Sequence, residues 1–468
     1  MRQLSSALGD GNFRRQTWAI VGGGFLGMTL ALRIARAGRD VTLFESARAL
    51  GGLASAWTLG DVVWDRHYHV TLQSDRYLLA LLAELGLTDN LEWAQTRTGF
   101  FVDGELFSMS NVAQFLAFPP LGLTDKLRLG ATILRASRIK NWKPLESISA
   151  IDWLTKWSGA RCVDKLWRPL LRAKLGDDYT EASAAFIWAI IARMYAARRT
   201  GMKTERFGYV GGGYARVLAR FEEVLRHAGV HVRTGTSVAA VERSPSGGVA
   251  VRFNDTLSTT FDQAVITLAS PLAARLIRGL SPSETEAMTA VAYQGIVCAS
   301  LLLRKPLAGY YVTNITDDWV PFTAVIEMSA LVDRRYFRGN ALVYLPKYVP
   351  PHDQLFEQPD EVVERRFVDA LARMYPDFDP ADVRAFKVSR VRYVLPISTL
   401  HYSDRLPPMA TSIPGLWTIG SAHIVNGTLN VNETLTLAES AAAMLLREGK
   451  AVPALADSVP ESSLAAVS

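Results

Sequence analysis

The feature that most constrains this chain is a stretch near its N-terminus in which an apolar strand, a glycine loop, a helix and a second strand follow one another. Residues 18–21 are a short apolar run typical of a buried parallel strand. They lead into a G-x-G-x-x-G loop at residues 22–27, and the helical pattern of residues 28–37 ends at a glycine. A β-branched strand over residues 41–44 then ends on Glu45. This order predicts a Rossmann-like α/β unit that binds a dinucleotide.

The residues of the loop have distinct physical roles. Gly22 permits the tight turn, Gly24 lets the backbone approach a pyrophosphate, and Gly27 lets the helix pack closely on the strand. Glu45 can accept a hydrogen bond from a ribose hydroxyl and would repel a 2′-phosphate, so the pattern disfavours NADP. The alternative is a glycine turn in an unrelated α/β unit, which the flanking strands disfavour. The cofactor contacts expected from the loop are Gly22, Gly24, Phe25, Leu26 and Gly27.

The composition indicates a globular chain of two or three domains, with 49% hydrophobic and 21% charged residues among 468. Cys162 and Cys298 are the two cysteines, which argues for a reducing compartment and against a disulfide framework. The polar N-terminus lacks the apolar core of a secretory signal, and we find no segment suited to span a membrane. We therefore expect a cytoplasmic protein.

The charge balance is basic, with a formal net charge of +6 and a pI of about 9.2. No nucleic-acid-binding motif accompanies it, so we expect no nucleic-acid partner. Attraction to an acidic membrane face or to a phosphorylated substrate is the favoured interpretation, and it would place the protein at the inner face of a membrane.

The residues that follow Glu45 indicate the nucleotide. Arg48 and the pair Gly51-Gly52 form an R-x-x-G-G turn just beyond the second strand. With the glycine loop, this pattern resembles the superfamily of FAD-dependent amine oxidases, protoporphyrinogen oxidases and phytoene desaturases. The resemblance implies an FAD cofactor and a GR2-type flavoprotein, in which a Rossmann-like FAD-binding domain is interleaved with an α+β substrate domain. It implies FAD contacts at Glu45, Ser46, Arg48, Gly51, Gly52 and Leu53.

Two histidines lie in the next segment, residues 60–71, whose alternating pattern predicts a strand. Their spacing would place His67 and His69 on one face of that strand. A metal site would need a third ligand that no nearby spacing supplies, so we expect no metal. In the family this segment runs under the isoalloxazine, and it also resembles the His-rich strand of UDP-galactopyranose mutase. By that resemblance His69, or second His67, is a catalytic candidate facing the flavin; the alternative is a hydrogen-bonded structural histidine.

Two further segments bear on the substrate. Residues 108–138 are first apolar and then basic. In relatives of the protoporphyrinogen oxidase kind, the comparable insertion touches the membrane and frames the substrate entrance. The alternative is that this segment is domain core with a solvated basic face. Residues 167–176 resemble a substrate-domain segment of the same branch. There Trp167 would line an apolar wall, while Arg168, Arg172 and Lys174 would meet an anionic substrate group; a solvated basic face is the alternative.

Two later segments resemble the remaining FAD contacts. The glycine cluster at residues 211–213, which we expect to follow no strand, opens a helix, and the backbone of Val238 further on would meet the adenine. Near the C-terminus a strand ends at Gly420, and Ser421 stands where the family has an acid. The start of the last helix would face the flavin, where its dipole stabilises negative charge. The residues expected there are Asn430, Val431 and Asn432.

The predicted organisation is discontinuous. We expect a disordered leader at residues 1–16 and a tail at residues 451–468. The FAD-binding domain would be assembled from residues 17–95, 205–290 and 405–450, and the substrate domain from residues 96–204 and 291–404.

The predicted function is FAD-dependent hydride transfer at a carbon of an apolar substrate. The resemblance suggests that this substrate is isoprenoid or lipid-linked. No side chain stands out as a general base, which suits chemistry driven by positioning. The alternatives are a flavin amine oxidase, a non-redox mutase that resembles UDP-galactopyranose mutase, and a non-catalytic flavin-binding protein. The expected partner is a small-molecule or lipid-like substrate; the prediction allows peripheral membrane contact and leaves the oligomeric state open.

Overall fold

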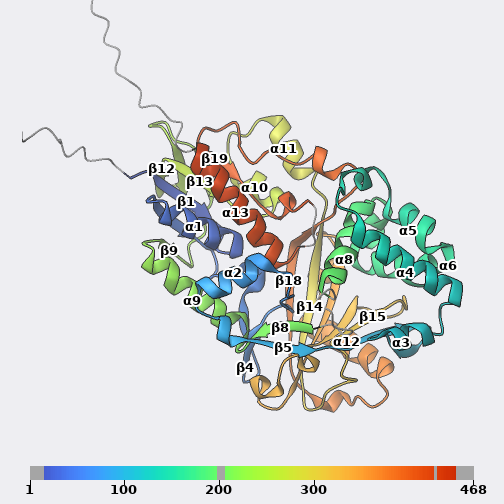
Figure 1. Ribbon diagram of the computed structural model, residues 1–468. Coiled ribbons are helices and arrows are strands. Elements are labelled where there is room, and N and C mark those ends of the chain that lie inside the picture. Colours follow the sequence, from blue (N-terminus) through green and yellow to red (C-terminus); the bar gives the residue numbers. More distant parts are fainter. Residues whose placement is uncertain (1–14, 198–205, 426–428, 449–468) are drawn as a thin grey trace, which may run out of the picture.

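The computed structural model describes residues 15–197, 206–425 and 429–448. The predicted leader, apart from Arg15 and Gln16, and the predicted tail lie outside the described residues. A five-stranded parallel sheet in the order β19-β13-β1-β2-β9 organises the first part of the molecule (Figure 1). It joins segments that are far apart in the sequence. Its strands are β1 (Thr17–Val21), β2 (Asp40–Phe44), β9 (His231–Arg233), β13 (Gln263–Ile266) and β19 (Leu416–Thr418).

Both faces of this sheet are covered. Helices pack on one face and share a core of buried aliphatic and aromatic side chains with it. A three-stranded antiparallel sheet of β10 (Ala240–Arg243), β11 (Val249–Arg252) and β12 (Ser258–Phe261) covers the other face. A sheet buried on both sides explains why its strands are short continuous apolar runs. The covering helices are α1 (Phe25–Arg36), α2 (Arg76–Glu84), α9 (Gly213–His227) and α13 (Val431–Glu448).

The second part is built on a seven-stranded sheet in the order β18-β14-β17-β16-β15-β6-β7. Its pairs are antiparallel except for β15 with β6. Helix α12 (Asp360–Met374) packs on it and lies where the sequence pattern predicts a helix. The strands are β6 (Thr98–Val102), β7 (Glu105–Ser108), β14 (Tyr293–Leu303), β15 (Val312–Ile315), β16 (Ala324–Glu327), β17 (Ala341–Val349) and β18 (Val383–Pro396).

A group of helices stands beside this sheet, in green and teal at the right of Figure 1. They bury tryptophan, leucine and isoleucine side chains among themselves. Within the described part of the chain, no helix is both long and apolar enough to cross a membrane. The main members are α3 (Val112–Ala117), α4 (Leu123–Arg138), α5 (Ala150–Ser158), α7 (Arg168–Leu175) and α8 (Ala184–Ala197).

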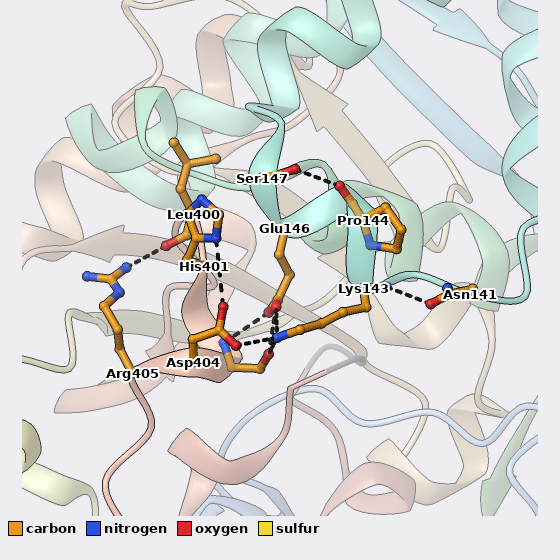
Figure 2. Close-up of polar contacts among 10 residues, drawn as sticks. Asn141, Lys143, Pro144, Glu146, Ser147, Leu400, His401, Asp404 and Arg405 are labelled. Atoms are coloured by element: carbon orange, nitrogen blue, oxygen red, sulfur yellow. Dashed lines mark hydrogen bonds and ion pairs between the residues drawn. The ribbon is translucent and has the colours of Figure 1, made fainter.

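A polar cluster holds the helical group to the segment that follows β18 (Figure 2). The buried Glu146 accepts hydrogen bonds from the backbone N–H and hydroxyl of Ser403, at 3.0 and 2.6 Å. Lys143 bridges Glu146 and Asp404, with its Nζ at 2.9 and 2.7 Å from their carboxylates. Because Glu146 has partners for both oxygens, its burial is tolerated, and the helices are held in a defined position.

Two predicted elements differ from the structure. Of the predicted strand over residues 60–71 only β4 (Val62–Asp65) forms, paired in a hairpin with the preceding β3 (Ala56–Leu59), and the chain is irregular after Asp65. The glycine cluster at residues 211–213 does follow a strand, β8 (Arg206–Val210). That strand pairs with β5 (Leu91–Gln95) in a separate sheet, so the cluster is still no second Rossmann loop.

Candidate functional site

The glycine loop connects the carboxyl end of β1, the central strand of the parallel sheet, to α1. Gly24 is the N-cap of α1, and the N–H of Met28 donates to its carbonyl at 2.9 Å. A Cβ atom placed on Gly27 would lie 1.9 Å from the carbonyl oxygen of Gly22, whereas one placed on Gly24 would meet nothing within 4 Å. Packing therefore requires Gly27 to be glycine, while Gly24 borders open space in front of the helix N-terminus.

The second glycine turn lies directly against this loop. The N–H of Gly51 donates to the carbonyl of Gly23 at 2.8 Å, and Gly51 pairs with Gly24 in an isolated parallel bridge. Gly51 has φ of +125°, a conformation that favours glycine. A Cβ atom there would also lie 2.5 Å from Leu218 of α9. The two glycine segments thus form one continuous backbone surface.

Glu45 fixes the position of that surface. One carboxylate oxygen accepts the N–H of Gly23 at 2.7 Å, and the other accepts the N–H of Ala47 at 2.8 Å. The oxygen that accepts from Ala47 also accepts the hydroxyl of Ser46 at 3.3 Å, whereas the oxygen that accepts from Gly23 keeps a lone pair for a further hydroxyl hydrogen bond.

Both glycine segments line a single cavity of about 1540 Å³. Away from them, the walls come from the helical group and from the seven-stranded sheet. These walls are mostly apolar, and the cavity reaches from the parallel sheet to helices α3 and α4. The apolar lining residues include Phe100, Phe115, Leu129, Ile133, Leu166, Leu170, Phe186, Ile187, Ile190, Ile191, Phe207 and Tyr311.

The cavity brings together most of the site residues predicted from the sequence. Those in its lining are Gly22, Gly24, Phe25, Leu26, Glu45, Arg48, Gly51, Gly52, Leu53, His67, His69, Trp167, Ser421, Asn430 and Val431. Those not among its described lining residues are Gly27, Ser46, Val238, Gly420, Asn432, Arg168 and Arg172.

Several of the predicted residues outside the lining have structural partners. Arg168 is 3.0 Å from Asp164 one turn earlier. Arg172 is exposed, with Nε 3.8 Å from Asp177. Asn432 accepts the N–H of Tyr77 at 3.0 Å and so caps α2. The two arginines therefore lie on a solvated face of α7, and the cation of that helix that lines the cavity is Lys174.

The two histidines follow β4, so the prediction that they share one face of a strand is wrong. His67 is buried, and its Nδ1 lies 3.0 Å from the carbonyl of Leu53. A carbonyl can only accept, so Nδ1 carries the proton and Nε2 is an acceptor, with no partner among the described residues. Burial lowers the pKa of His67 to about 4, which keeps the ring neutral at neutral pH. The ring of His69 packs at 4.8 Å from that of Tyr214.

Asp65, the last residue of β4, has a long-range partner. Its buried carboxylate accepts the N–H of Tyr214 at 2.7 Å, in the first turn of α9. The N-cap residue of this helix, Gly212, has no side chain to do so. Asp65 therefore fixes α9, which in turn contacts Gly51 through Leu218. Sequence patterns did not reveal this role, because the partners are 149 residues apart.

A family model described as flavin containing amine oxidoreductase matches residues 27–446. The chain belongs to this family. Membership implies a flavin cofactor, and it confirms the superfamily predicted from the glycine loop and the R-x-x-G-G turn.

Similar proteins agree with the family. Over 292 residues the chain is 27% identical to a coproporphyrinogen III oxidase of Mycobacterium tuberculosis, a match that covers 57% of this chain and 62% of that protein. Over 204 residues it is 27% identical to a zeta-carotene desaturase of Synechocystis, covering 38% and 41%. The matched part of the chain thus covers about three fifths or less of the length of these two relatives. The solved structure of an oxidoreductase from Methanosarcina mazei has a TM-score of 0.71 at 16% identity, covering 91% and 100%, and supports the predicted fold class.

In this member of the flavin-containing family, the last helix begins at the cavity. Asn430 accepts the N–H of Glu433 at 3.1 Å and caps α13, whose first residue Val431 lines the cavity. Ser421, which replaces the acid expected from the family, lies 3.3 Å from the hydroxyl of Tyr293. A helix N-terminus and a neutral hydroxyl thus face the cavity where the resemblance placed a flavin contact.

Proposed function

We propose that this protein is an FAD-dependent oxidoreductase that removes hydride from a carbon of an apolar substrate, of the isoprenoid or lipid-linked kind. One observation carries the proposal: the glycine segments line one end of the cavity, and apolar side chains line the rest of it. Its volume of about 1540 Å³ exceeds the roughly 300–1,000 Å³ of ordinary ligand sites, so it has room for a dinucleotide and a second molecule.

The residues present fit FAD. The first turn of α1 carries no acidic residue, and the open space at Gly24 lies in front of its N–H groups, which would hold the pyrophosphate. Glu45 would accept a ribose hydroxyl. The start of α13 would face the ring system, where its dipole stabilises negative charge. FAD, when bound, supplies the hydride-accepting chemistry.

The lining favours an apolar substrate over an amine. Among the described lining residues the one carboxylate is Glu45, whose oxygens already accept two backbone N–H groups. Because Glu45 lies at the glycine segments, an ammonium group at the apolar walls would find no carboxylate among the described lining residues. The similarity to a zeta-carotene desaturase agrees with an apolar substrate.

The chain's own part in the reaction is to position the substrate and exclude water. His67 holds its proton at Nδ1 against Leu53, so the ring that lines the cavity is neutral and leaves the backbone of the glycine turn fixed in place. Tyr68 is a phenol whose pKa is raised well above 10 by burial, so it donates a hydrogen bond rather than acting as a base. Close placement of the substrate carbon then accounts for the rate.

We further propose that the substrate enters from a membrane surface at α3 and α4. Val112, Leu123 and Leu127 are 72%, 67% and 64% exposed, although such side chains are usually buried. Val112 also lines the cavity. Bases such as Arg128 lie on the same helix. An apolar patch with cations beside a cavity mouth suits peripheral contact with anionic lipid.

Vesicle binding tests this contact. We expect the protein to sediment with phosphatidylglycerol vesicles and the double variant Leu123→Glu/Leu127→Glu to stay in solution. The matched control Leu257→Glu/Val362→Glu changes exposed apolar residues elsewhere and should bind like the unmodified protein. Equal binding by both double variants would refute the proposal.

Anaerobic titration tests the reaction. We expect isoprenoid substrates to bleach the bound flavin, and Ile133→Asp, which puts a charge into the cavity wall, to slow bleaching by about tenfold or more. Leu134→Asp, on the exposed side of the same helix, is the control. Product that forms without flavin reduction would instead indicate the mutase, and bleaching by amines alone would indicate an amine oxidase.

A further inference from the structure

A small polar group stands in the otherwise apolar part of the cavity. It consists of Lys174 from α7, Tyr348 from β17 and Tyr68 from the segment after β4, and all three line the cavity. The two tyrosine hydroxyls are 3.1 Å apart. The ammonium of Lys174 lies 5.2 Å from the centroid of the Tyr348 ring, in a cation–π contact.

The hydroxyl of Thr323 links the two backbone segments that carry Lys174 and Tyr348. The hydroxyl of Thr323 donates to the carbonyl of Ala173, next to Lys174, at 2.8 Å. The same oxygen accepts the N–H of Tyr348 at 3.4 Å. Helix α7 and strand β17 are therefore tied together beside the group, and the lysine and the tyrosine are held in place by more than their own contact.

Lys174 differs from three arginines of the helical group, Arg168, Arg172 and Arg193. Arg168 and Arg172 have aspartate neighbours outside the cavity, and Arg193, which lines the cavity, is 3.1 Å from the buried Asp75. In the described part of the chain, no carboxylate lies within ion-pair distance of the Lys174 ammonium. A half-buried cation without a counter-ion is costly, and a ligand with negative charge would offset that cost.

The tyrosine pair adds a donor. Each hydroxyl has one proton, and the bond between the two hydroxyls uses one of them. The second proton is left for another acceptor, and both tyrosines line the cavity. Because burial raises the pKa of Tyr68 far above its ordinary value, this proton stays on the pair at neutral pH.

We infer that Lys174 and the Tyr68–Tyr348 pair form a binding site for an anionic group, a carboxylate or a phosphate, at one end of an otherwise apolar substrate. The inference rests on the proposed function, which assigns this cavity to the substrate. It narrows the substrate class to an apolar molecule with an acidic end. Since Tyr68 adjoins His67, which is bonded to Leu53 of the glycine turn, the acidic end would be held at a fixed distance from the cofactor side.

Calorimetric titration of the flavin-loaded protein tests the inference, with decanoate, decyl phosphate, decanol and decylamine as probes. These share one chain and differ in the end group. We expect at least one of the two anions to bind about tenfold or more tightly than decanol, because a charge-assisted hydrogen bond is typically worth that factor, and decylamine to bind no better than decanol. Comparing decanoate with decyl phosphate shows which anion the site accepts.

Variants locate the effect. Lys174→Met and Lys174→Gln should reduce the preference for the anion to within about twofold, and Lys174→Arg should restore part of it. Arg172→Met, on the exposed side of the same helix, should keep the full preference. Tyr348→Phe should lower the anion's affinity several-fold with little effect on decanol.

Either of two results would overturn the inference: an anion preference that survives both Lys174 variants, or anions that bind no better than decanol to the unmodified protein. Binding is measured without turnover. An anion preference in a protein whose flavin no substrate reduces would therefore leave this site standing while removing the proposed reaction.

Discussion

Two alanine substitutions in one loop should have opposite effects, because the two glycines are required for different reasons. In Gly27→Ala the new Cβ would lie 1.9 Å from the carbonyl oxygen of Gly22, where real Cβ atoms essentially never come within 3.0 Å of another atom. Loop and helix must separate by about 1 Å in a buried layer, and such overpacking costs about 1–3 kcal/mol. Gly24→Ala adds a Cβ to open space at an extended backbone (φ −76°, ψ 178°), so the flavin-free protein should lose less than about 1 kcal/mol.

For cofactor binding the order should be reversed, because Gly24→Ala should weaken FAD binding directly. The Cβ of Gly24→Ala occupies the space in front of the helix N-terminus, and we expect FAD to bind about 100-fold more weakly. At an FAD concentration 100 times the dissociation constant of the unmodified protein, FAD stabilises that protein by about 2.7 kcal/mol. The same concentration would stabilise the variant by only about 0.4 kcal/mol.

Urea denaturation with and without FAD measures both quantities. The unmodified protein should gain stability from FAD, Gly24→Ala should be nearly as stable without FAD but gain little from it, and Gly27→Ala should be unstable from the outset. A Gly24→Ala protein that gains as much from FAD as the unmodified protein would refute the assignment of this space to the pyrophosphate.

Three further predictions concern groups around the cavity. The folded pKa of His67, about 4, lies below the ordinary 6.5, so the folded state binds fewer protons between these values and stability falls on acidification. The free energy of unfolding should fall by about 2–3 kcal/mol between pH 6.5 and 4.5. In His67→Gln, urea denaturation over the same pH range should show no such fall. Asp65→Ala leaves the start of α9 uncapped and should cost about 1–3 kcal/mol by urea denaturation, whereas Asp65→Asn, which keeps an acceptor, should cost less. Arg33→Met removes the partly exposed pairs with Glu84 and Glu439 that join α1, α2 and α13, and its cost of about 1 kcal/mol should shrink in high salt.

The parts of the fold that depend on local pattern could be predicted from the sequence. The glycine loop, the strand that ends on Glu45 and the helix over residues 360–374 are encoded by neighbouring residues. Assembly of the parallel sheet from distant segments came from resemblance, since no local pattern specifies which strands pair.

The parts that depend on distant partners could not be predicted. The alternation of residues 60–71 suggests one strand, but Asp65 turns its carboxylate to α9 and the chain leaves the sheet there. The sequence offers Arg168, Arg172 and Lys174 alike as cations for an anionic group, and only the helix geometry shows that Lys174 is the one that lines the cavity. No local pattern singles out Tyr68, because its partner, Tyr348, is 280 residues away.

The central claim is that this chain holds FAD in the cavity formed by its two glycine segments. The most direct test is the visible absorbance spectrum of the purified protein, followed by identification of the flavin released on denaturation. We expect a flavin spectrum, with FAD and not FMN as the released molecule. A folded protein that carries no flavin, and takes up none when FAD is supplied, would contradict the claim and the function built on it.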